Sequence, residues 1–504
     1  MLARVLSAAV VGIEAALVHV EVDVTSGLPL YATVGLPDSA VRESRERVRS
    51  AIRNAGFTVP NERITVNLAP ADVRKEGSSF DLPIALGILK ATKQIPADRA
   101  AEIVVVGELA LDGQVQPVRG ALAVSLACRR HGIGTLLVPC ENAAEAAAVG
   151  GIDVAGAGTL REAVAVLNGA AAPTPPAPTP PPGAAEELDL ADVRGQAHAK
   201  RALEISAAGG HNLLLVGPPG AGKTMLARRL PPLLPPLADD EVLEVSTIWS
   251  VAGLLARRGT LMRARPFRAP HHTVSVAGLV GGGRPPHPGE VTLAHRGVLF
   301  MDELPEFPQH VLESLRQPLE DGTVSIVRAA GVSEFPARFQ LVAAANPCRR
   351  GCASLELCVC TPGERERYLG RISGPLLDRI DLQVELPAVG GDEFAQGGRG
   401  DDTATVRARV ALARQRQRER FGPTSVRLNA ELTPRQIRRV GAIAVEGQRL
   451  LTAAMTRLGL SARGHDRALK VARTIADLAG SPTVDAEHCA EALQYRGLDR
   501  RWRP

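Results

Sequence analysis

The chain has 504 residues, of which 45% are hydrophobic and 22% are charged, as in an ordinary soluble globular protein of roughly two to four domains. This composition excludes a wholly disordered chain, a collagen and a small disulfide-stabilised protein. No run of about 18 apolar residues lacks a charge, which argues against a membrane protein. The net charge of +5 is too small to identify a nucleic-acid-binding protein, but it is unevenly distributed. Residues 401–504 hold 20 Lys and Arg against 11 Asp and Glu, a surplus of +9, which fits either contact with phosphates or a set of solvated helix faces.

Cysteine usage and the N-terminal pattern indicate a cytoplasmic protein. Seven cysteines is an odd number, and Cys128, Cys140 and Cys489 stand alone in the sequence, which disfavours a disulfide framework. The apolar N-terminal run is interrupted by Glu14, and apolar residues then alternate over residues 18–24. This alternation predicts a half-buried first strand rather than a cleaved signal peptide.

Residues 1–169 are predicted to form a mixed α/β domain. After the strand at 18–24, Asp38 can cap a helix that ends near Gly56. The hydrophobic patterns that follow predict strands and helices in alternation. The strands are at 64–68 and 103–106, and the helices are at 82–89 and 121–128.

A change of composition at residues 170–188 predicts a linker, because this proline-rich segment favours the extended polyproline II conformation. A doubly wound α/β core is predicted over residues 189–390, followed by a small helical lid over residues 391–504. In the core, short apolar runs fit strands that are buried on both faces of a parallel sheet; they are 213–216, 298–301 and 341–345. In the lid, helical spacing is found at 406–420, 434–458 and 466–479.

A complete P-loop pattern follows the first of these buried strands. It consists of Gly217, Pro218, Pro219, Gly220, Ala221, Gly222, Lys223 and Thr224. Glycines let successive backbone amides curl around phosphates, and the positive end of the following helix points at them. Lys223 is predicted to reach the β- and γ-phosphates of ATP, and the Thr224 hydroxyl is predicted to join the Mg²⁺ shell.

Polar residues at the ends of the next two buried strands predict the rest of a hydrolytic site. Asp302 and Glu303 are typical of a Walker B pair, in which Asp302 holds Mg²⁺ through water and Glu303 orients and polarises the attacking water. Asn346 can act as a polar sensor of the γ-phosphate, with a turn-forming role before Pro347 as the alternative. For Arg379, spacing alone does not separate completion of a neighbouring subunit's site from an ordinary salt bridge to Asp378 or Asp381.

These motifs and the trailing helices resemble an AAA+ ATPase of the magnesium-chelatase and replicative-helicase branch. Three longer segments narrow the resemblance to the YifB/ComM family, and together they span most of the chain. They are 35–44 (GLPDSAVRES), 265–273 (RPFRAPHHT) and 373–381 (SGPLLDRID).

The resemblance implies a hexameric ring with ATP bound between subunits. Arg379 is then the arginine finger that acts in trans, and Arg463 is the sensor-2 arginine of the lid, with Arg467 as the second choice. It also implies a branch-migration motor that extends heteroduplex DNA in recombination during natural transformation. Because aromatic residues are scarce, DNA contact is expected to be mainly to phosphates.

The N-terminal domain resembles the Lon-protease domain, which has a ribosomal-protein-S5-like fold. Residues 75–79 align with the segment that carries the nucleophilic serine of the protease, which would be Ser79. The catalytic lysine is expected at the position of Val124, and without an amine there no Ser–Lys dyad can form. Lys75 is nearby in sequence, but nothing in the sequence places it against Ser79. We therefore expect a protease-like fold without protease activity.

Four cysteines lie close together in the segment that directly follows Asn346-Pro347. Their four thiolates could bind a structural Zn²⁺ and so stabilise a polar loop. They are Cys348, Cys352, Cys358 and Cys360. The spacing is not the paired CxxC of zinc ribbons, and four reduced thiols without a metal are the alternative. Some YifB/ComM relatives carry a similar cluster, which favours zinc.

Two adjacent histidines, His271 and His272, lie in one of the family segments. Because adjacent residues on a regular element point in different directions, chelation of a metal by this pair is not expected. Arg263, Arg265 and Arg268 lie nearby. We expect the segment to form a loop that faces the ring pore or a neighbouring subunit.

Three other functions share the same core. A metallochelatase motor is disfavoured by the additional Lon-like domain and by the lack of a recognisable integrin-like domain. An ATP-dependent protease is disfavoured by Val124. A protein-remodelling ATPase, with an N-terminal domain that only binds a partner, stays open.

Overall fold

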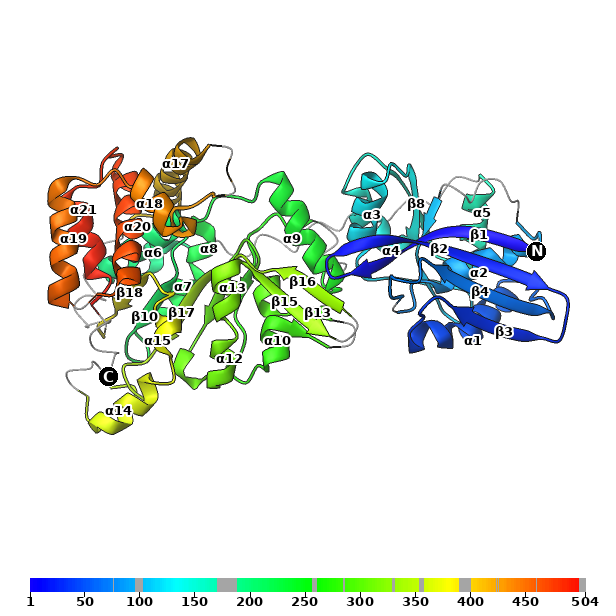
Figure 1. The fold of residues 1–504 in the computed structure, drawn as a ribbon, viewed down its shortest axis with the longest axis horizontal. Helices are drawn as coiled ribbons and strands as arrows, with labels where there is room; N and C mark the ends of the chain where they lie inside the picture. The colour runs from blue at the N-terminus through cyan, green and yellow to red at the C-terminus, as the bar shows by residue number, and fades with distance from the viewer. Residues whose placement is uncertain are drawn as a thin grey trace.

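The computed structural model describes residues 1–75, 77–95, 103–169, 188–255, 261–283, 286–328, 331–352, 358–388, 400–422, 424, 426–458 and 460–497. Figure 1 shows an elongated molecule in which an N-terminal sheet domain, a central α/β core and a C-terminal helical region follow one another. The predicted mixed α/β class with a helical C-terminal part is confirmed. The predicted proline-rich linker, apart from Leu188, lies outside the described residues. Within the described ranges, no helix is long and apolar enough to cross a membrane.

The N-terminal domain is built on a seven-stranded mixed sheet with the order β3-β4-β2-β1-β5-β8-β9. Its strands are β1 (Leu2–Val11), β2 (Glu14–Thr25), β3 (Leu30–Val34), β4 (Arg63–Ala69), β5 (Ile103–Val105), β8 (Thr135–Pro139) and β9 (Asp153–Ala157). The predicted strand at 18–24 lies in β2, but it is the second strand and not the first. It pairs antiparallel with β1, whose alternation is hidden because consecutive residues such as Ala8 and Ala9 are both buried.

Five helices pack around this sheet, and a two-stranded ribbon precedes the third of them. The helices are α1 (Ser39–Asn54), α2 (Asp81–Ala91), α3 (Ala121–Arg130), α4 (Cys140–Ala147) and α5 (Leu160–Leu167), and the ribbon is β6 (Glu108–Leu109) with β7 (Val115–Gln116). As predicted, the Asp38 carboxylate caps α1, where it accepts a 2.8 Å hydrogen bond from the Val41 amide. Helix α2 is almost entirely buried and forms the centre of this core.

The central core contains a five-stranded sheet with the order β11-β14-β17-β10-β18, in which every neighbouring pair is parallel. Its strands are β10 (Leu213–Val216), β11 (Phe267–Arg268), β14 (Val298–Met301), β17 (Gln340–Ala345) and β18 (Leu382–Glu385). Strands β10, β14 and β17 are buried along their whole length, as predicted from their uninterrupted apolar runs. The carboxyl ends of these three strands meet at one edge of the sheet, where ligands bind in open α/β folds.

Helices and two small hairpins surround this sheet. The helical segments are η1 (Leu190–Asp192), α6 (Ala197–Gly209), α7 (Lys223–Arg228), α8 (Leu230–Leu233), α9 (Asp239–Val251), α10 (Val276–Val280), α11 (Glu290–Leu293), η2 (Leu304–Glu306), α12 (Gln309–Glu313), α13 (Arg316–Asp321), α14 (Pro362–Leu369) and α15 (Gly374–Leu377). The hairpins are β12 (Gly281–Gly282) with β13 (His287–Pro288), and β15 (Thr323–Arg328) with β16 (Gly331–Pro336).

The C-terminal region is helical, as predicted, but it contains more helices than the hydrophobic spacing indicates. Its segments are α17 (Thr403–Phe421), η3 (Asn429–Glu431), α18 (Pro434–Val440), α19 (Val445–Leu458), α20 (Ala462–Ala479) and α21 (Ala486–Gln494). The single helix predicted at 434–458 is therefore two helices. The chain turns between them, where Ile443 forms a parallel bridge with Val484.

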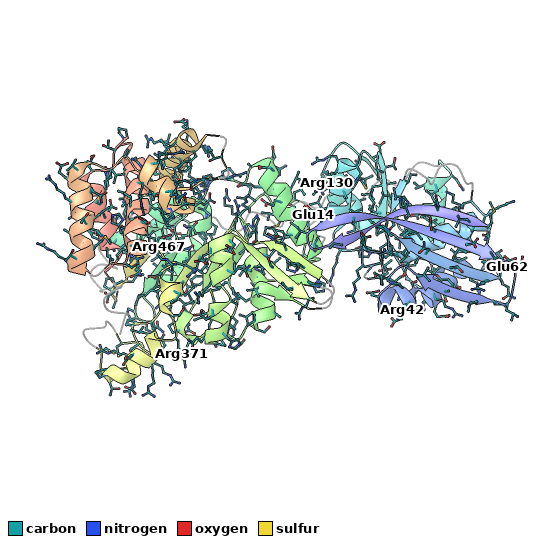
Figure 2. All side chains as sticks on the ribbon, in the orientation of Figure 1. Glu14, Arg42, Glu62, Arg130, Arg371 and Arg467 are labelled. Carbon is teal, nitrogen blue, oxygen red and sulfur yellow. The ribbon has the colours of Figure 1, made fainter. Side chains whose placement is uncertain are left out.

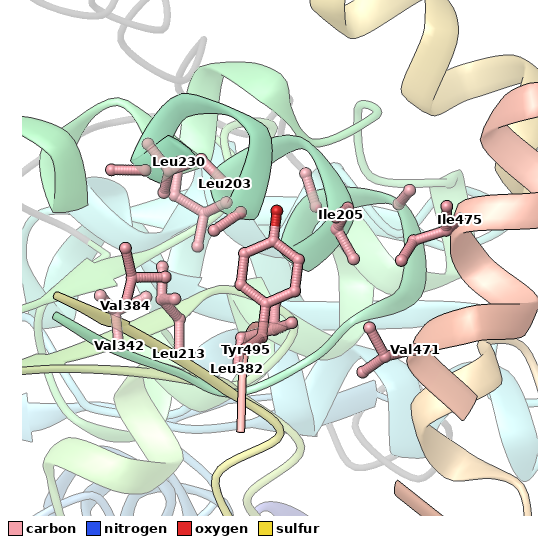
Figure 3. Packing of buried hydrophobic residues seen from close by; sticks show 14 of the residues in the cluster. Leu203, Ile205, Leu213, Leu230, Val342, Leu382, Val384, Val471, Ile475 and Tyr495 are labelled. Atoms are coloured by element: carbon pink, nitrogen blue, oxygen red, sulfur yellow. The ribbon is translucent and has the colours of Figure 1, made fainter. Parts of the chain in front are cut away.

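Tyr495 anchors the end of this helical region on the central core. Figure 3 shows its ring among Leu203, Leu213 and Leu382, which come from α6, β10 and β18. The ring also stacks on His198, with the ring centroids 4.8 Å apart. The lid and the nucleotide-binding sheet thus share one hydrophobic core.

Helix α3 of the N-terminal domain packs against α9 of the central core. The Gly120 amide donates to the Ser250 carbonyl oxygen at 3.1 Å, and Leu122 lies in one buried apolar cluster with Trp249. Figure 2 places Glu14 and Arg130, whose charged groups are 3.4 Å apart, beside this contact. The two domains therefore share a buried apolar contact in addition to the linker.

Candidate active site

The P-loop lies between the buried end of β10 and the start of α7, in the strand–loop–helix setting that the sequence predicts. Gly220 and Gly222 adopt left-handed backbone angles, with φ of +79° and +87°, and a Cβ atom on either would project into open space. At Gly217 a Cβ atom would approach the Leu386 carbonyl oxygen to 2.8 Å. The glycines are therefore needed for the curl of the loop and for its close contact with Leu386, which directly follows β18.

The Lys223 ammonium lies on the floor of this loop. It donates hydrogen bonds to the carbonyl oxygens of Gly217 and Pro218, at 2.6 and 2.9 Å, and to Oδ1 of Asn346 at 2.9 Å. Burial lowers the pKa of Lys223, while the nearby Asp302 and Glu303 carboxylates act in the opposite direction. The structure thus brings Asn346 to the P-loop lysine, as a polar sensor requires.

Asp302 and Glu303 follow β14 directly and lie beside the P-loop. The Thr224 hydroxyl donates to Oδ2 of Asp302 at 2.8 Å, and the Glu303 amide donates to Oδ1 of the same carboxylate at 3.0 Å. Glu303 itself has a left-handed φ of +52°, a sharp turn held by that hydrogen bond. Its side chain is 54% exposed and can reach solvent.

These residues fit a nucleoside triphosphate with Mg²⁺. The glycine loop leaves an open cradle that side chains would fill. The adjacent hydroxyl and carboxylate of Thr224 and Asp302 are the hard oxygen ligands that Mg²⁺ prefers. An ammonium group at the floor of the cradle supplies the charge that phosphates need.

The two histidines do not lie on a regular element, and their rings do not point in different directions. They sit in a turn after β11 with ring centroids 4.1 Å apart, and Nδ1 of His272 is 3.9 Å from a carboxylate oxygen of Glu303. Nearby, Arg265 donates to the backbone oxygens of Pro235 and Arg296. The segment therefore contacts the Walker B turn of its own chain, a contact that the sequence did not predict.

Arg379, Arg463 and Arg467 line one cavity of about 1050 Å³ between the central core and the lid, and no P-loop residue lines it. Arg379 is 6% exposed and pairs with Glu320. Arg467 pairs with Asp381 at 3.1 Å, whereas Arg463 is exposed. Among the described residues, the structure thus gathers the predicted finger and sensor arginines together, apart from the P-loop of the same chain.

The four clustered cysteines converge. Their sulfur atoms all lie within 4.8 Å of one another, and the Cys352 amide donates to Sγ of Cys348 at 3.4 Å. Burial opposes ionisation of Cys348, but hydrogen bonds from this amide and from the other thiols outweigh it and lower the pKa to about 7. The set offers four sulfur donors at the separation expected of ligands around one tetrahedral metal ion.

The predicted protease positions do not form a dyad. The ammonium of Lys75 is buried and donates to the Pro70 carbonyl oxygen. The backbone oxygen of Ser79 accepts a hydrogen bond from the Gly107 amide at 2.9 Å. Val124, at the expected position of the catalytic lysine, is 2% exposed within an apolar cluster.

Comparison with known proteins identifies the family. Residues 189–394 match the family described as magnesium chelatase, subunit ChlI, residues 20–142 match subunit ChlI of Mg-chelatase, and residues 400–496 match the subunit ChlI C-terminal family. The chain is 46% identical to competence protein ComM of Haemophilus influenzae over 99% of its own length and 98% of ComM. The chain belongs to the YifB/ComM group of magnesium-chelatase-like AAA+ ATPases.

Other relatives match either the whole chain or its N-terminal region. Uncharacterized protein Rv2897c of Mycobacterium tuberculosis is 47% identical over 99% of both chains. Uncharacterized protein YifB of Escherichia coli is 44% identical over 98% of this chain and 96% of its own. Lon protease 1 of Hydrogenovibrio crunogenus is 26% identical over 140 residues, which are 26% of this chain and 17% of the protease. The N-terminal region is thus Lon-like, as predicted.

Two contacts of the site were not predicted from the sequence. Gly351 in the cysteine loop packs on Pro219 of the P-loop. The Tyr368 hydroxyl, whose pKa is raised by burial, interacts with the backbone of Asn346. Neither pair is close in sequence, and only the three-dimensional fold brings them together.

Proposed function

We propose that this ATPase is a hexameric DNA motor that drives branch migration and heteroduplex extension in DNA recombination, as during natural transformation. The observation that carries the proposal is the similarity along the whole chain to competence protein ComM. Similarity over the entire length includes the N-terminal domain, the ATPase core and the lid, so it covers every part that such a motor would use.

Hydrolysis of ATP is assigned to the residues gathered at the carboxyl ends of β10, β14 and β17. Lys223 and the P-loop amides bind and orient the phosphates, Thr224 and Asp302 hold Mg²⁺, and Glu303 polarises the attacking water. Mg²⁺ neutralises charge on the phosphate oxygens when it is bound. Asn346, hydrogen-bonded to the lysine ammonium, senses the phosphate end.

Arg379 and Arg463 are assigned to the nucleotide of a neighbouring subunit. Their shared cavity is lined by no P-loop residue, which supports action on a nucleotide bound by another chain. An arginine supplied in trans stabilises charge in the transition state. This assignment makes hydrolysis depend on ring assembly.

Contact with DNA is assigned mainly to arginines of the lid. Five exposed arginines lie on α18 and α19, namely Arg435, Arg438, Arg439, Arg449 and Arg457. Arginines on short helices bind phosphate oxygens without reading the base sequence. This fits a motor that must act on any sequence.

The four-cysteine cluster is assigned to a structural Zn²⁺. Bound to Cys348, Cys352, Cys358 and Cys360, the ion would fix the loop that follows Asn346. The Lon-like domain is assigned a non-proteolytic role, since Val124 supplies no amine to a nucleophilic serine.

The test is ATP hydrolysis by the purified full-length chain with and without branched DNA. We expect DNA to stimulate hydrolysis, and Lys223→Ala to abolish both the basal and the stimulated rate. Arg367→Ala is a matched control, because this exposed arginine donates, among the described residues, to the Gly363 carbonyl oxygen of its own helix and lies near Glu364 of the same helix. Hydrolysis that no DNA stimulates would contradict the DNA motor and favour a chelatase-type or protein-remodelling ATPase. Casein degradation that depends on Ser79 would instead indicate an ATP-dependent protease.

A further inference from the structure

The turn after β11 presents two histidines that have different partners. Nδ1 of His271 lies 2.9 Å from the Thr273 hydroxyl, and the His271 carbonyl oxygen accepts from the Val274 amide at 3.0 Å. These contacts close the turn. His272, in the middle of the turn, takes no part in them.

The His272 ring is instead directed at the Walker B turn. Its Nδ1 atom is 3.9 Å from a carboxylate oxygen of Glu303, and its ring meets the Phe307 ring edge-on with centroids 6.4 Å apart. This separation is too long for a direct hydrogen bond but short enough for one bridging water. The side chain of His272 is 36% exposed, so water can enter.

The Glu303 side chain has few close partners among the described residues, although its charge also interacts with the Lys223 ammonium. Among the residues that the structure describes, His272 provides the one ion-pair contact of the Glu303 carboxylate. A half-exposed carboxylate without a partner populates several rotamers. A general base must lie within hydrogen-bond reach of its water in one of them.

The turn that carries His272 is fixed at both ends. Arg268, just before it, forms a two-pronged ion pair with Glu290, at 2.6 and 2.7 Å, and lies over the Trp249 ring. Ser275, just after it, caps α10 through the Gly278 amide. Because Trp249 belongs to α9, the same anchor borders the contact with the N-terminal domain.

We propose that His272 is a positioning residue that holds the Glu303 carboxylate in the orientation needed to polarise the attacking water. The inference rests on the proposed catalytic role of Glu303. The imidazole does not touch the reacting atoms and acts through Glu303. Its placement on an anchored turn makes the orientation of the carboxylate depend on the α9 region as well as on the P-loop.

The test compares three substitutions at position 272 in the full-length protein. His272→Leu removes the polar atom, and we expect kcat for ATP to fall by about 10- to 100-fold with little change in KM, as for a catalytic group displaced by up to about 1 Å. His272→Asn places an amide nitrogen at the position of Nδ1 and should restore most of the rate. His272→Gln places its amide one bond further out and should not.

The matched control is His310→Leu, because His310 is an exposed histidine of α12 and its replacement leaves both rings of the turn in place. It should hydrolyse ATP at close to the wild-type rate, and all variants should unfold at the wild-type temperature. Wild-type kcat in His272→Leu, or equal loss in the Leu and Asn variants, would overturn the inference. Glu303→Gln separates this failure from failure of the proposed function: if it stays active, the catalytic assignment of Glu303 itself is wrong.

Discussion

Replacing Gly351 with alanine tests whether the cysteine loop and the P-loop support one another. Gly351 has a left-handed φ of +67°, and a Cβ atom there would lie 2.8 Å from Cγ and 3.0 Å from Cδ of Pro219. The left-handed backbone costs alanine about 1 kcal/mol. A contact this short with a rigid proline ring adds about 1 kcal/mol more.

The resulting strain of about 2 kcal/mol corresponds to a factor of about 30 in an equilibrium constant. It must be relieved by movement of the P-loop, which would weaken ATP binding, or of the cysteine loop, which would weaken zinc binding. We therefore expect the dissociation constants of ATP and zinc to rise by a combined factor of about this size.

The assay is titration of Gly351→Ala with a fluorescent ATP analogue, together with the zinc content after dialysis against a chelator. Gly363→Ala is the control, because a Cβ atom on this nearby glycine meets nothing within 4 Å. Wild-type affinity for both ligands in a folded Gly351→Ala protein would refute the reasoning.

Three further predictions concern the neighbouring subunit, the metal and the domain contact. Arg379→Ala by itself should abolish ATP hydrolysis. Mixing it with the Lys223→Ala protein should restore part of the rate, because some interfaces then combine an intact Lys223 of one subunit with an intact Arg379 of the other. No recovery in mixed rings would contradict action in trans. The wild-type protein should contain one zinc per chain by metal analysis and Cys348→Ser should contain almost none, whereas near-zero zinc in both would refute the metal site. Glu145 of α4 interacts with Ser250 of α9 at the domain contact, and burial raises its pKa from 4.5 to about 7. The unfolded chain therefore releases this proton first, and stability falls as the pH rises from about 4.5 to about 7. Glu145→Gln should remove this part of the pH dependence in thermal unfolding, and an unchanged profile would show that Glu145 does not cause it.

The residues that bind phosphate could be predicted because their chemistry is local. The P-loop needs glycines and a lysine at fixed spacing after a strand, and Asp302 and Glu303 stand at the end of another buried strand. The sequence also predicted Asn346 as a polar group near the γ-phosphate. Its hydrogen bond to Lys223 could not be predicted, because that contact depends on the order of strands in the sheet.

What the sequence could not predict depends on contacts between distant segments. Leu122 and Trp249 have the composition of core residues, and nothing in their local pattern shows that they join two domains. The pairing of His272 with Glu303 crosses from the edge strand β11 to β14. Between α18 and α19 the helical spacing continues, and the break arises from the tertiary bridge of Ile443 with Val484.

Branch migration of a synthetic four-way junction is the most direct measurement of the central claim. With ATP and Mg²⁺, the wild-type protein should convert the junction into two duplexes, and Glu303→Gln should bind the same junction without converting it. Conversion that needs no ATP, or wild-type protein that hydrolyses ATP but leaves every junction intact, would contradict the claim.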